Sequence, residues 1–173
     1  MTIVTPSHWL AESARSSSLF HGWQVKVIPN GIDTQCFQPI DKNNAREILS
    51  LPKDKKLILF GAIKASSDQN KGGHLFKEML RHLSQKYRQN DCEIIIFGTS
   101  KPSKESQVIF KTHYMVHLYD DITLALLYSA ADLFVCPSLL ENLPNTIMES
   151  LACGTPVVAF HAGGIPELIE HCK

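Results

Sequence analysis

Short apolar runs alternate with segments of helical periodicity along most of the chain. Four runs have the length of a strand and are bounded by a glycine or a proline. They read LILFG, CEIIIFG, DLFVCP and PVVAF, at residues 57–61, 92–98, 132–137 and 156–160. Because these runs are continuously apolar and do not alternate with polar residues, they predict strands that are buried on both faces. Briefer strands are predicted at residues 25–28 and near residues 116–118.

Helical spacing occupies the segments between these runs. In residues 74–87, apolar side chains recur at intervals of three and four, namely Leu75, Phe76, Met79, Leu80, Leu83 and Tyr87. Caps, glycines and prolines predict further helices at residues 8–17 after Ser7, 45–51 before Pro52, 120–131, 145–153 before Gly154, and 163–172 with Pro166 in the first turn. Strands alternating with helices predict an α/β fold with a doubly wound parallel sheet, in which ligands bind at the carboxyl ends of the strands.

Composition and charge narrow the class of protein. Lys and Arg together number 17, as do Asp and Glu, so the formal net charge is zero, and no basic stripe indicates a nucleic-acid partner. The five cysteines are widely spaced and form no CxxC pair, which favours free thiols in a reducing cytosol over disulfides or zinc. The first ten residues, MTIVTPSHWL, do not have the pattern of a signal peptide, and no apolar stretch approaches the ~20 residues that a membrane helix needs. We therefore expect a soluble, cytoplasmic protein.

Two glutamates eight positions apart flank the predicted start of the helix at residues 145–153. Glu141 lies in the loop after the DLFVCP strand, and Glu149 lies in the opening turns of the helix. The free amides near Asn145 and Thr146 are suited to an anion such as a diphosphate. Lys71, after the LILFG strand, can neutralise phosphate oxygens, and a carboxylate in the same crevice can accept hydrogen bonds from sugar hydroxyls.

Structural explanations of the same residues stay open at this point. Thr146 and Glu149 have the spacing of a capping box, which by itself accounts for Glu149. Glu141 fits an ordinary solvated loop acid, and Lys71 fits a surface lysine. From the residues alone, the inference ends at a cytosolic α/β domain with an anion site at its carboxyl-end crevice.

Other kinds of site are disfavoured. His113 and His117 stand four residues apart, but their stretch is extended rather than helical, so they do not indicate a metal site. The sequence contains no nucleophile elbow, no GxGxxG and no Walker loop.

Six blocks in order carry a family resemblance. They are PNGID followed by Phe37, KGG from Lys71, AADLFVCPS, the E-x7-E pair, ESLACGTPVVA and GGIPELI. Together they resemble the C-terminal, nucleotide-sugar-binding half of retaining GT-B glycosyltransferases of family 4 (group 1), from about residue 25 to the end. The most similar members are bacterial enzymes that build exopolysaccharide, capsule or lipopolysaccharide.

The resemblance implies a role for each matching residue. Glu149 is expected to bind the ribose hydroxyls, Glu141 to lie near the donor sugar as a catalytic-site residue, and Lys71 to stabilise the departing diphosphate. The backbone near the donor is expected to be formed by Gly61, Gly98, Asn142, Leu143, Asn145 and Thr146. The resemblance implies no metal and no cofactor, since the nucleotide-diphosphate sugar is a substrate. The family's arginine after the first strand is replaced by Ala62, with Lys64 as the candidate substitute, and NLPN replaces a glycine-rich segment.

The resemblance also implies a division of the chain. Residues 1–24 are expected to be the remnant (last helix and linker) of an acceptor-binding N-terminal domain, and residues 25–173 a nucleotide-sugar-binding domain truncated at its C-terminal end. The full-length protein is expected at the inner face of the plasma membrane, with membrane contact only through absent parts. An alternative is a non-catalytic nucleotide-sugar-binding module that works with a separate acceptor-domain partner. A nucleotide-sugar epimerase is a more distant alternative that the E-x7-E block disfavours.

Overall fold

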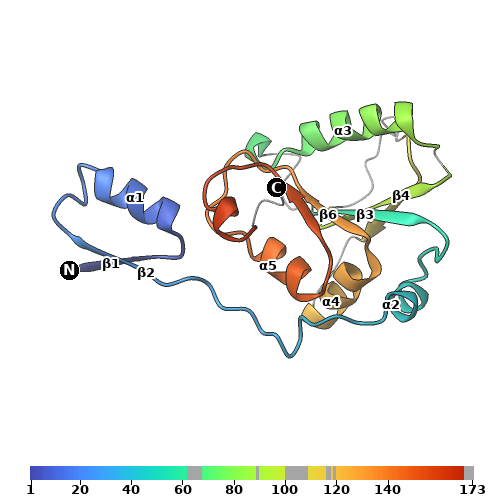
Figure 1. The fold of residues 1–173 in the computed structure, drawn as a ribbon, viewed down its shortest axis with the longest axis horizontal. Coiled ribbons are helices and arrows are strands. Elements are labelled where there is room, and N and C mark those ends of the chain that lie inside the picture. The colour runs from blue at the N-terminus through green and yellow to red at the C-terminus, as the bar shows by residue number, and fades with distance from the viewer. Residues whose placement is uncertain (62–67, 89, 100–108, 116–117, 119, 170–173) are drawn as a thin grey trace.

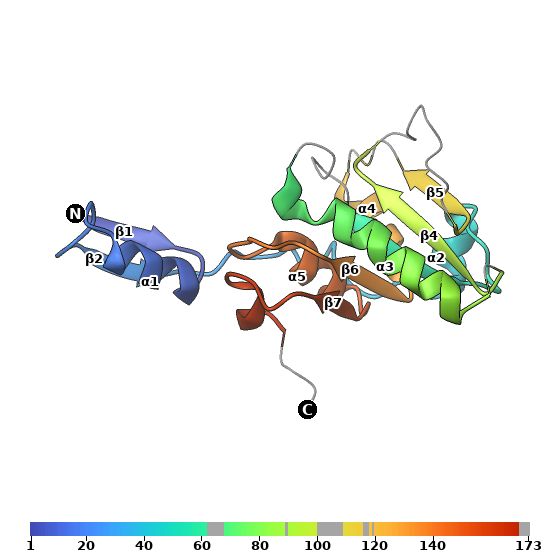
Figure 2. The same cartoon turned by 90° about the horizontal axis from the view of Figure 1, so that it is seen from above.

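The computed structural model describes residues 1–61, 68–88, 90–99, 109–115, 118 and 120–169. In these ranges a five-stranded sheet carries helices on both faces, and a small N-terminal unit lies beside it (Figures 1 and 2). The elements in chain order are β1 Thr2–Thr5, α1 His8–Ser16, β2 Gln24–Val27, α2 Lys42–Ile48, β3 Lys56–Gly61, the 3-10 helix η1 Gln69–Lys71, α3 Gly73–Lys86, β4 Cys92–Phe97, β5 Thr112–Met115, α4 Asp121–Ala130, β6 Leu133–Cys136, α5 Asn145–Ala152, β7 Val157–Ala159 and the 3-10 helix η2 Ile165–Glu167.

The sheet has the order β5-β4-β3-β6-β7, and every neighbouring pair is parallel. The chain proceeds outward from β3 to β5, then crosses back to place β6 on the other side of β3. The switch point of the topology therefore lies between β3 and β6, which is where ligands bind in sheets of this kind. The order confirms the predicted doubly wound parallel sheet.

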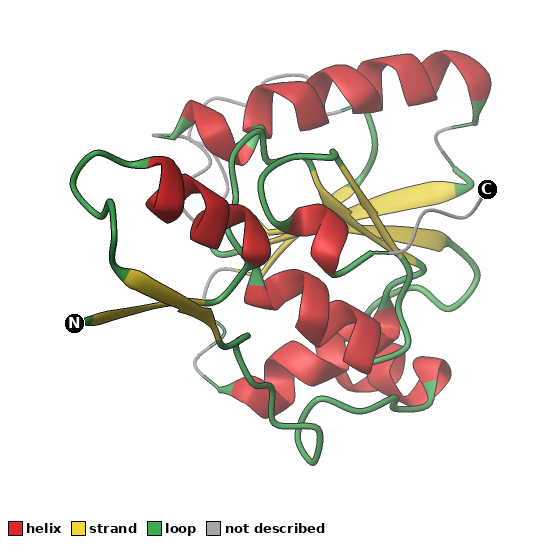
Figure 3. Cartoon of the chain, turned by 60° about the vertical axis from the view of Figure 1, so that its left-hand side comes forward, coloured by secondary structure: helices red, strands yellow, loops and turns green. Residues whose placement is uncertain are grey.

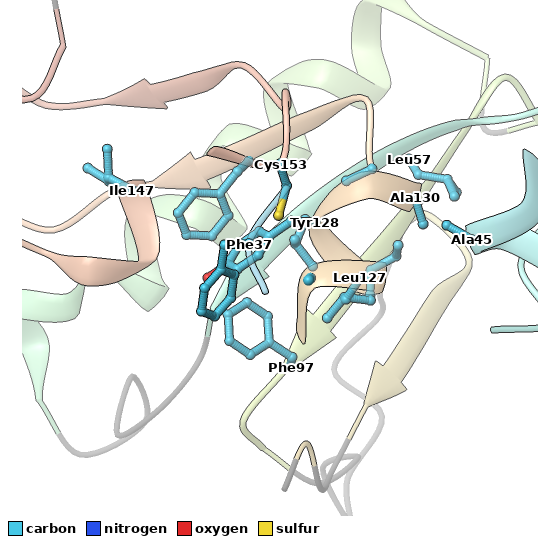
Figure 4. Packing of buried hydrophobic residues seen from close by; sticks show 14 of the residues in the cluster. Phe37, Ala45, Leu57, Phe97, Leu127, Tyr128, Ala130, Ile147 and Cys153 are labelled. Carbon is cyan, nitrogen blue, oxygen red and sulfur yellow. The ribbon is translucent and has the colours of Figure 1, made fainter. Parts of the chain in front are cut away.

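Alternating side chains of the central strands supply two separate cores. Leu57 and Leu59 of β3 face the core formed with α2, α4 and α5, of which Figure 4 shows a part. Phe60 faces the opposite side, where its ring stacks on Phe76 of α3 with centroids 4.2 Å apart. Because both faces of each strand are covered, the strands are continuously apolar in sequence. Figure 3 shows the helices on the two sides of the sheet.

The helix caps agree with the sequence. Ser7 accepts from the Leu10 amide at 3.1 Å at the start of α1, and Asp120 accepts from the Thr123 amide at 2.7 Å at the start of α4. Gly154, with φ of +78°, follows the end of α5. These local signals placed three helices correctly. The helix predicted at residues 45–51 instead starts at Lys42 with Asp41 as its cap and ends at Ile48.

Several expectations about elements were wrong. The strand predicted near residues 116–118 is found at β5, and residues 116–117 lie outside the described part of the chain. The helix predicted at residues 163–172 is a single 3-10 turn, η2, in the described residues, and residues 170–173 lie outside them. Tyr87, expected on the buried stripe of α3, is 59% exposed at the helix end.

The N-terminal unit contains an element that the sequence reading missed. β1 has four residues and pairs in parallel with β2, in a sheet separate from the large one. The unit contacts the rest of the chain through α1, whose His8 and Trp9 amides each donate to the Glu167 carboxylate at 2.8 Å. The domain boundary predicted between residues 24 and 25 falls inside β2, and the assignment of residues 1–24 to an acceptor-binding domain stays a prediction.

The cysteines of the described residues are free thiols, as expected. Cys92, Cys136 and Cys153 are buried and Cys36 is partly buried, whereas Cys172 lies outside the described part. Burial raises the pKa of Cys92 and of Cys153 to about 11. Among the described residues, no helix is long and apolar enough to cross a membrane.

Candidate functional site

The carboxyl ends of the central strands meet at one edge of the sheet. Gly61 at the end of β3 is in register with Phe97 of β4, and Phe60 is in register with Val135 of β6. The segments that follow β3 and β6 therefore leave the sheet side by side at the switch point. Every predicted site residue except Glu149 lies in these segments or in those beside them.

Lys71 and Glu141 form an ion pair at this edge. Nζ of Lys71 lies 2.5 Å from Oε1 of Glu141, and the same oxygen accepts a hydrogen bond from the Ser138 hydroxyl at 3.2 Å. The Lys71 side chain is 37% exposed and the Glu141 side chain 17%. Glu141 is therefore not a solvated loop acid, and Lys71 is not a surface lysine without a partner.

The backbone around Lys71 explains its position. Gly72 has φ of +68°, and a Cβ there would lie 1.9 Å from the carbonyl oxygen of Pro137. The Leu139 amide donates to the Asn70 carbonyl at 2.8 Å. Since only glycine permits so close an approach, the sequence KGG places the lysine against the segment that follows β6.

The start of α5 presents amides toward this edge. Among the described residues, no group accepts from the backbone amides of Asn142, Leu143, Asn145 or Thr146. The Leu143 side chain is buried, and the Asn145 side chain accepts from the Asn30 amide group at 3.0 Å. The Asn142 side chain accepts from the Ser7 hydroxyl at 2.5 Å, so it contacts the N-terminal unit. The backbone rather than the side chains of this loop is available to an anion.

Glu149 does not take part in a capping box. The cap position of α5 is Pro144, Thr146 lies inside the helix, and no side chain caps the helix start. Oε2 of Glu149 instead accepts a hydrogen bond from the Tyr128 hydroxyl at 2.9 Å. Burial and the nearby Asp121 carboxylate raise the pKa of Glu149, while the Tyr128 hydrogen bond opposes that rise. The capping explanation of Glu149 is therefore wrong.

Glu149 also lines a cavity of about 250 Å³. The other lining residues come from the segment before α2, from the start of α4 and from α5: Gly31, Ile32, Asp33, Phe37, Asp121, Asn145 and Met148. Of the described residues that line it, three have carboxylate side chains and none has a cationic one. Such a lining suits a neutral ligand that donates hydrogen bonds, such as a diol, better than it suits a phosphate.

Gly61 and Gly98, the two glycines expected beside a nucleotide, are also required by the fold. A Cβ at Gly61 would lie 2.9 Å from the ring of Phe97. Gly98 has φ of +80°, and its amide donates to the Met115 carbonyl at 3.2 Å. Ala62 and Lys64 lie outside the described residues.

Sequence reasoning missed several residues of the site. Asp33 and Phe37 belong to the block PNGID followed by Phe37, which carries the family resemblance but by itself indicates no role for either residue. Asp121 lies at the start of the helix predicted at residues 120–131, where an acidic residue is ordinary. No sequence pattern indicates a role for Tyr128 or Ser138. The partner of Tyr128, Glu149, is 21 residues away, and the contact of Ser138 with Glu141 depends on the conformation of the loop after β6. His113 contacts a buried carboxylate, Oε2 of Glu93, at 2.6 Å, and His117 lies outside the described residues.

Comparisons with known proteins agree with this arrangement. The family model described as "Glycosyl transferases group 1" matches residues 54–173. The D-inositol 3-phosphate glycosyltransferase of Segniliparus rotundus is 31% identical over 154 residues, which are 83% of this chain and 33% of that protein. The putative teichuronic acid biosynthesis glycosyltransferase TuaC of Bacillus subtilis is 29% identical over 168 residues, which are 96% of this chain and 40% of that protein. The chain thus spans less than half the length of these relatives.

Solved structures share the fold. Sucrose-phosphate synthase from Thermosynechococcus elongatus aligns with a TM-score of 0.75 at 24% identity, over 95% of this chain and 41% of that one. HepE of Anabaena, solved in complex with UDP and glucose, aligns with a TM-score of 0.67 at 21% identity, over 98% of this chain and 47% of that one.

Proposed function

Because this chain belongs to the group 1 glycosyl transferases, we propose that it is the donor-binding half of an enzyme that transfers a glycosyl group from a nucleotide-diphosphate sugar, with retention of anomeric configuration. Its fold is the C-terminal half of the GT-B fold of the solved neighbours. The observation that carries the proposal is the Lys71–Glu141 pair beside the free amides of α5, at the switch point of the sheet.

Two groups of residues suit two neighbouring parts of a nucleotide sugar, the diphosphate and the ribose. Lys71 and the amides at the start of α5 offer positive charge and donors for a diphosphate. Glu149, in a cavity lined by carboxylates, offers acceptors for the ribose hydroxyls. HepE, which has this fold, holds UDP and glucose in its solved structure, and this supports a nucleotide sugar as the ligand.

Catalysis by these residues is electrostatic. When the glycosidic bond to the diphosphate breaks, negative charge develops on the leaving phosphate, and Lys71 and the α5 amides stabilise it. Lys71 is paired with Glu141 in the structure, so a diphosphate that binds Lys71 has to compete with this carboxylate. Glu141 then becomes free to accept from the hydroxyls of the donor sugar. The scheme requires no metal and no cofactor.

The names of two similar proteins support a proposal for the pathway. TuaC is named for teichuronic acid biosynthesis, and the structural neighbour WaaG for lipopolysaccharide biosynthesis. We propose a bacterial surface polysaccharide as the product, with the acceptor bound by a domain outside this chain, at the cytoplasmic face of the membrane. Other relatives are named as D-inositol 3-phosphate glycosyltransferases, so the names within this group refer to more than one kind of compound.

A thermal-shift panel of UDP, GDP, ADP and their sugars tests the proposal. Ligand at ~100 times its dissociation constant should add roughly 2.7 kcal/mol to the free energy of unfolding. The nucleotides that carry one of the three bases should stabilise the chain more than the others do. Glu149→Gln should reduce that stabilisation. If no nucleoside diphosphate or nucleotide sugar shifts the melting temperature, the proposed function is wrong.

A further inference from the structure

Tyr128 of α4 is fixed in the core with its hydroxyl directed at Glu149. The side chain is fully buried, and its ring meets those of Phe97 and Phe134 edge to face, with centroids 6.1 Å and 5.7 Å away. In Figure 4, Tyr128 lies among the labelled side chains of this core. The Tyr128 carbonyl accepts from the Thr155 hydroxyl at 2.7 Å, so the backbone is held as well. Because the ring and the backbone are both held, the hydroxyl oxygen has a fixed position beside Glu149.

The hydrogen bond from Tyr128 determines which part of Glu149 remains available. It occupies Oε2, and among the described residues no other side chain or amide donates to either carboxylate oxygen of Glu149. Glu149 lines the cavity, so its second oxygen remains for a ligand. We propose that Tyr128 is a positioning residue for nucleotide binding, which orients the Glu149 carboxylate so that one oxygen accepts from a diol. This inference rests on the proposed function.

The same hydrogen bond favours the ionised form of Glu149, which its surroundings disfavour. Asp121 from α4 and Asp33 from the segment before α2 line the cavity with it, and the thiols of Cys153 and Cys136 lie near the Tyr128 hydroxyl. None of these groups is a cation. Burial and Asp121 raise the pKa of Glu149, and the Tyr128 hydroxyl is the group that lowers it. Removing the hydroxyl should therefore raise the pKa of Glu149 further.

The experiment compares Tyr128→Phe with wild type and with Tyr87→Phe, which removes a hydroxyl from an exposed residue. Calorimetric titrations use UDP, GDP and ADP at a series of pH values from about 5 to 8. The ionic strength is kept at about 0.15 M throughout, so that screening of charges is the same at every pH. Tyr128→Phe should weaken the affinity for the preferred nucleotide about tenfold at neutral pH, as expected for one hydrogen bond to a charged group. The pH at which affinity is half lost should also move upward, because a Glu149 with a higher pKa is neutralised earlier as pH falls.

If Tyr128 had only a structural role, Tyr128→Phe would lower the melting temperature but would not change the pH at which half of the nucleotide affinity is lost, called the pH midpoint below. In the Glu149→Gln background, adding Tyr128→Phe should cost much less affinity than it does in wild type. If Tyr128→Phe fails to fold, 3-fluorotyrosine at position 128 makes the phenol a stronger donor and should move the midpoint downward.

The outcomes separate this inference from the proposed function. If wild type binds none of the three nucleotides, the proposed function is overturned. If wild type binds one of them and neither change at Tyr128 moves the pH midpoint, the positioning role is overturned while the proposed function stands.

Discussion

Lys71 and Glu141 are 70 residues apart in sequence, yet Nζ of the lysine lies 2.5 Å from Oε1 of the glutamate. The pair joins the segment after β3 to the segment after β6, on the two sides of the switch point. Two oppositely charged residues that are expected to contact one ligand thus also contact each other. The charge of Lys71 at this place is the basis of the first prediction.

Lys71→Ala should weaken the binding of a nucleoside diphosphate much more than that of the nucleoside. Hydrogen bonds to charged groups contribute roughly 1.5–3 kcal/mol, so the diphosphate should lose at least about tenfold in affinity. Calorimetry with each diphosphate and its nucleoside measures the difference. Lys77→Ala, which removes an exposed lysine of α3, is the matched control. Equal losses for diphosphate and nucleoside would exclude a phosphate role for Lys71.

Glu149→Gln should weaken nucleotide binding about tenfold, because a charged acceptor of paired hydroxyls is lost. The same change should stabilise the fold at neutral pH. Since the folded-state pKa of Glu149 is raised above its ordinary value of 4.5, its ionisation costs stability as pH rises from that value through the folded-state pKa. Urea unfolding at pH 4 and pH 7.5 should show a gain for the variant only at the higher pH. Nucleotide binding equal to that of wild type would contradict the ribose role.

Much of the fold could be predicted because its signals are local. The runs LILFG and CEIIIFG predict buried strands, since both faces of β3 and β4 are covered. Ser7, Asp120 and Gly154 mark helix ends through bonds or dihedral angles that involve only near neighbours. Topology then places Lys71 and Glu141 at one edge of the sheet.

The remaining features depend on packing between distant segments. The capping box of Thr146 and Glu149 fits the sequence pattern, but α5 begins two residues too early for it, with Pro144 and not Thr146 at the cap position. Tyr128 of another helix holds Glu149 instead. Arg46 looks like a surface residue of an ordinary helix. Its side chain is 4% exposed, and it donates to Asp132 and to three backbone carbonyls, those of Lys53, Lys55 and Ala130. No spacing rule predicts such contacts, because they arise only when α2 packs beside α4.

Gly72→Ala should destabilise the chain more than Gly22→Ala. Both glycines have positive φ, +68° and +80°, so each substitution forces an L residue into a costly backbone region, at about 1–2 kcal/mol. A Cβ at Gly22 meets no atom within 4 Å, whereas a Cβ at Gly72 would lie 1.9 Å from the Pro137 carbonyl oxygen. Gly72→Ala must also displace Lys71, so affinity for the diphosphate should fall as well.

Denaturant unfolding measures the two stabilities and calorimetry measures the affinities. Gly22→Ala should bind nucleotide like wild type, because Gly22 lies in the N-terminal unit outside the site. If Gly72→Ala were no less stable than Gly22→Ala and bound nucleotide equally well, the close approach of the segments after β3 and β6 would not be what positions Lys71.

The 173-residue chain by itself should bind a nucleotide weakly and transfer no sugar. The proposed donor site lies in its described residues, and the chain spans 33% and 40% of two relatives that are named as glycosyltransferases. Holding an acceptor against the donor carbon can lower a barrier by ~7–11 kcal/mol, and that contribution has to come from a second binding surface. Incubation of the purified chain with the donor that it binds best, with product detection by mass spectrometry, measures transfer and hydrolysis. Lys71→Ala assayed in parallel distinguishes activity of the chain from that of a contaminant. Turnover within the usual range for enzymes, ~1–1000 per second, that disappears in the Lys71→Ala variant would show that the donor half is a complete catalyst.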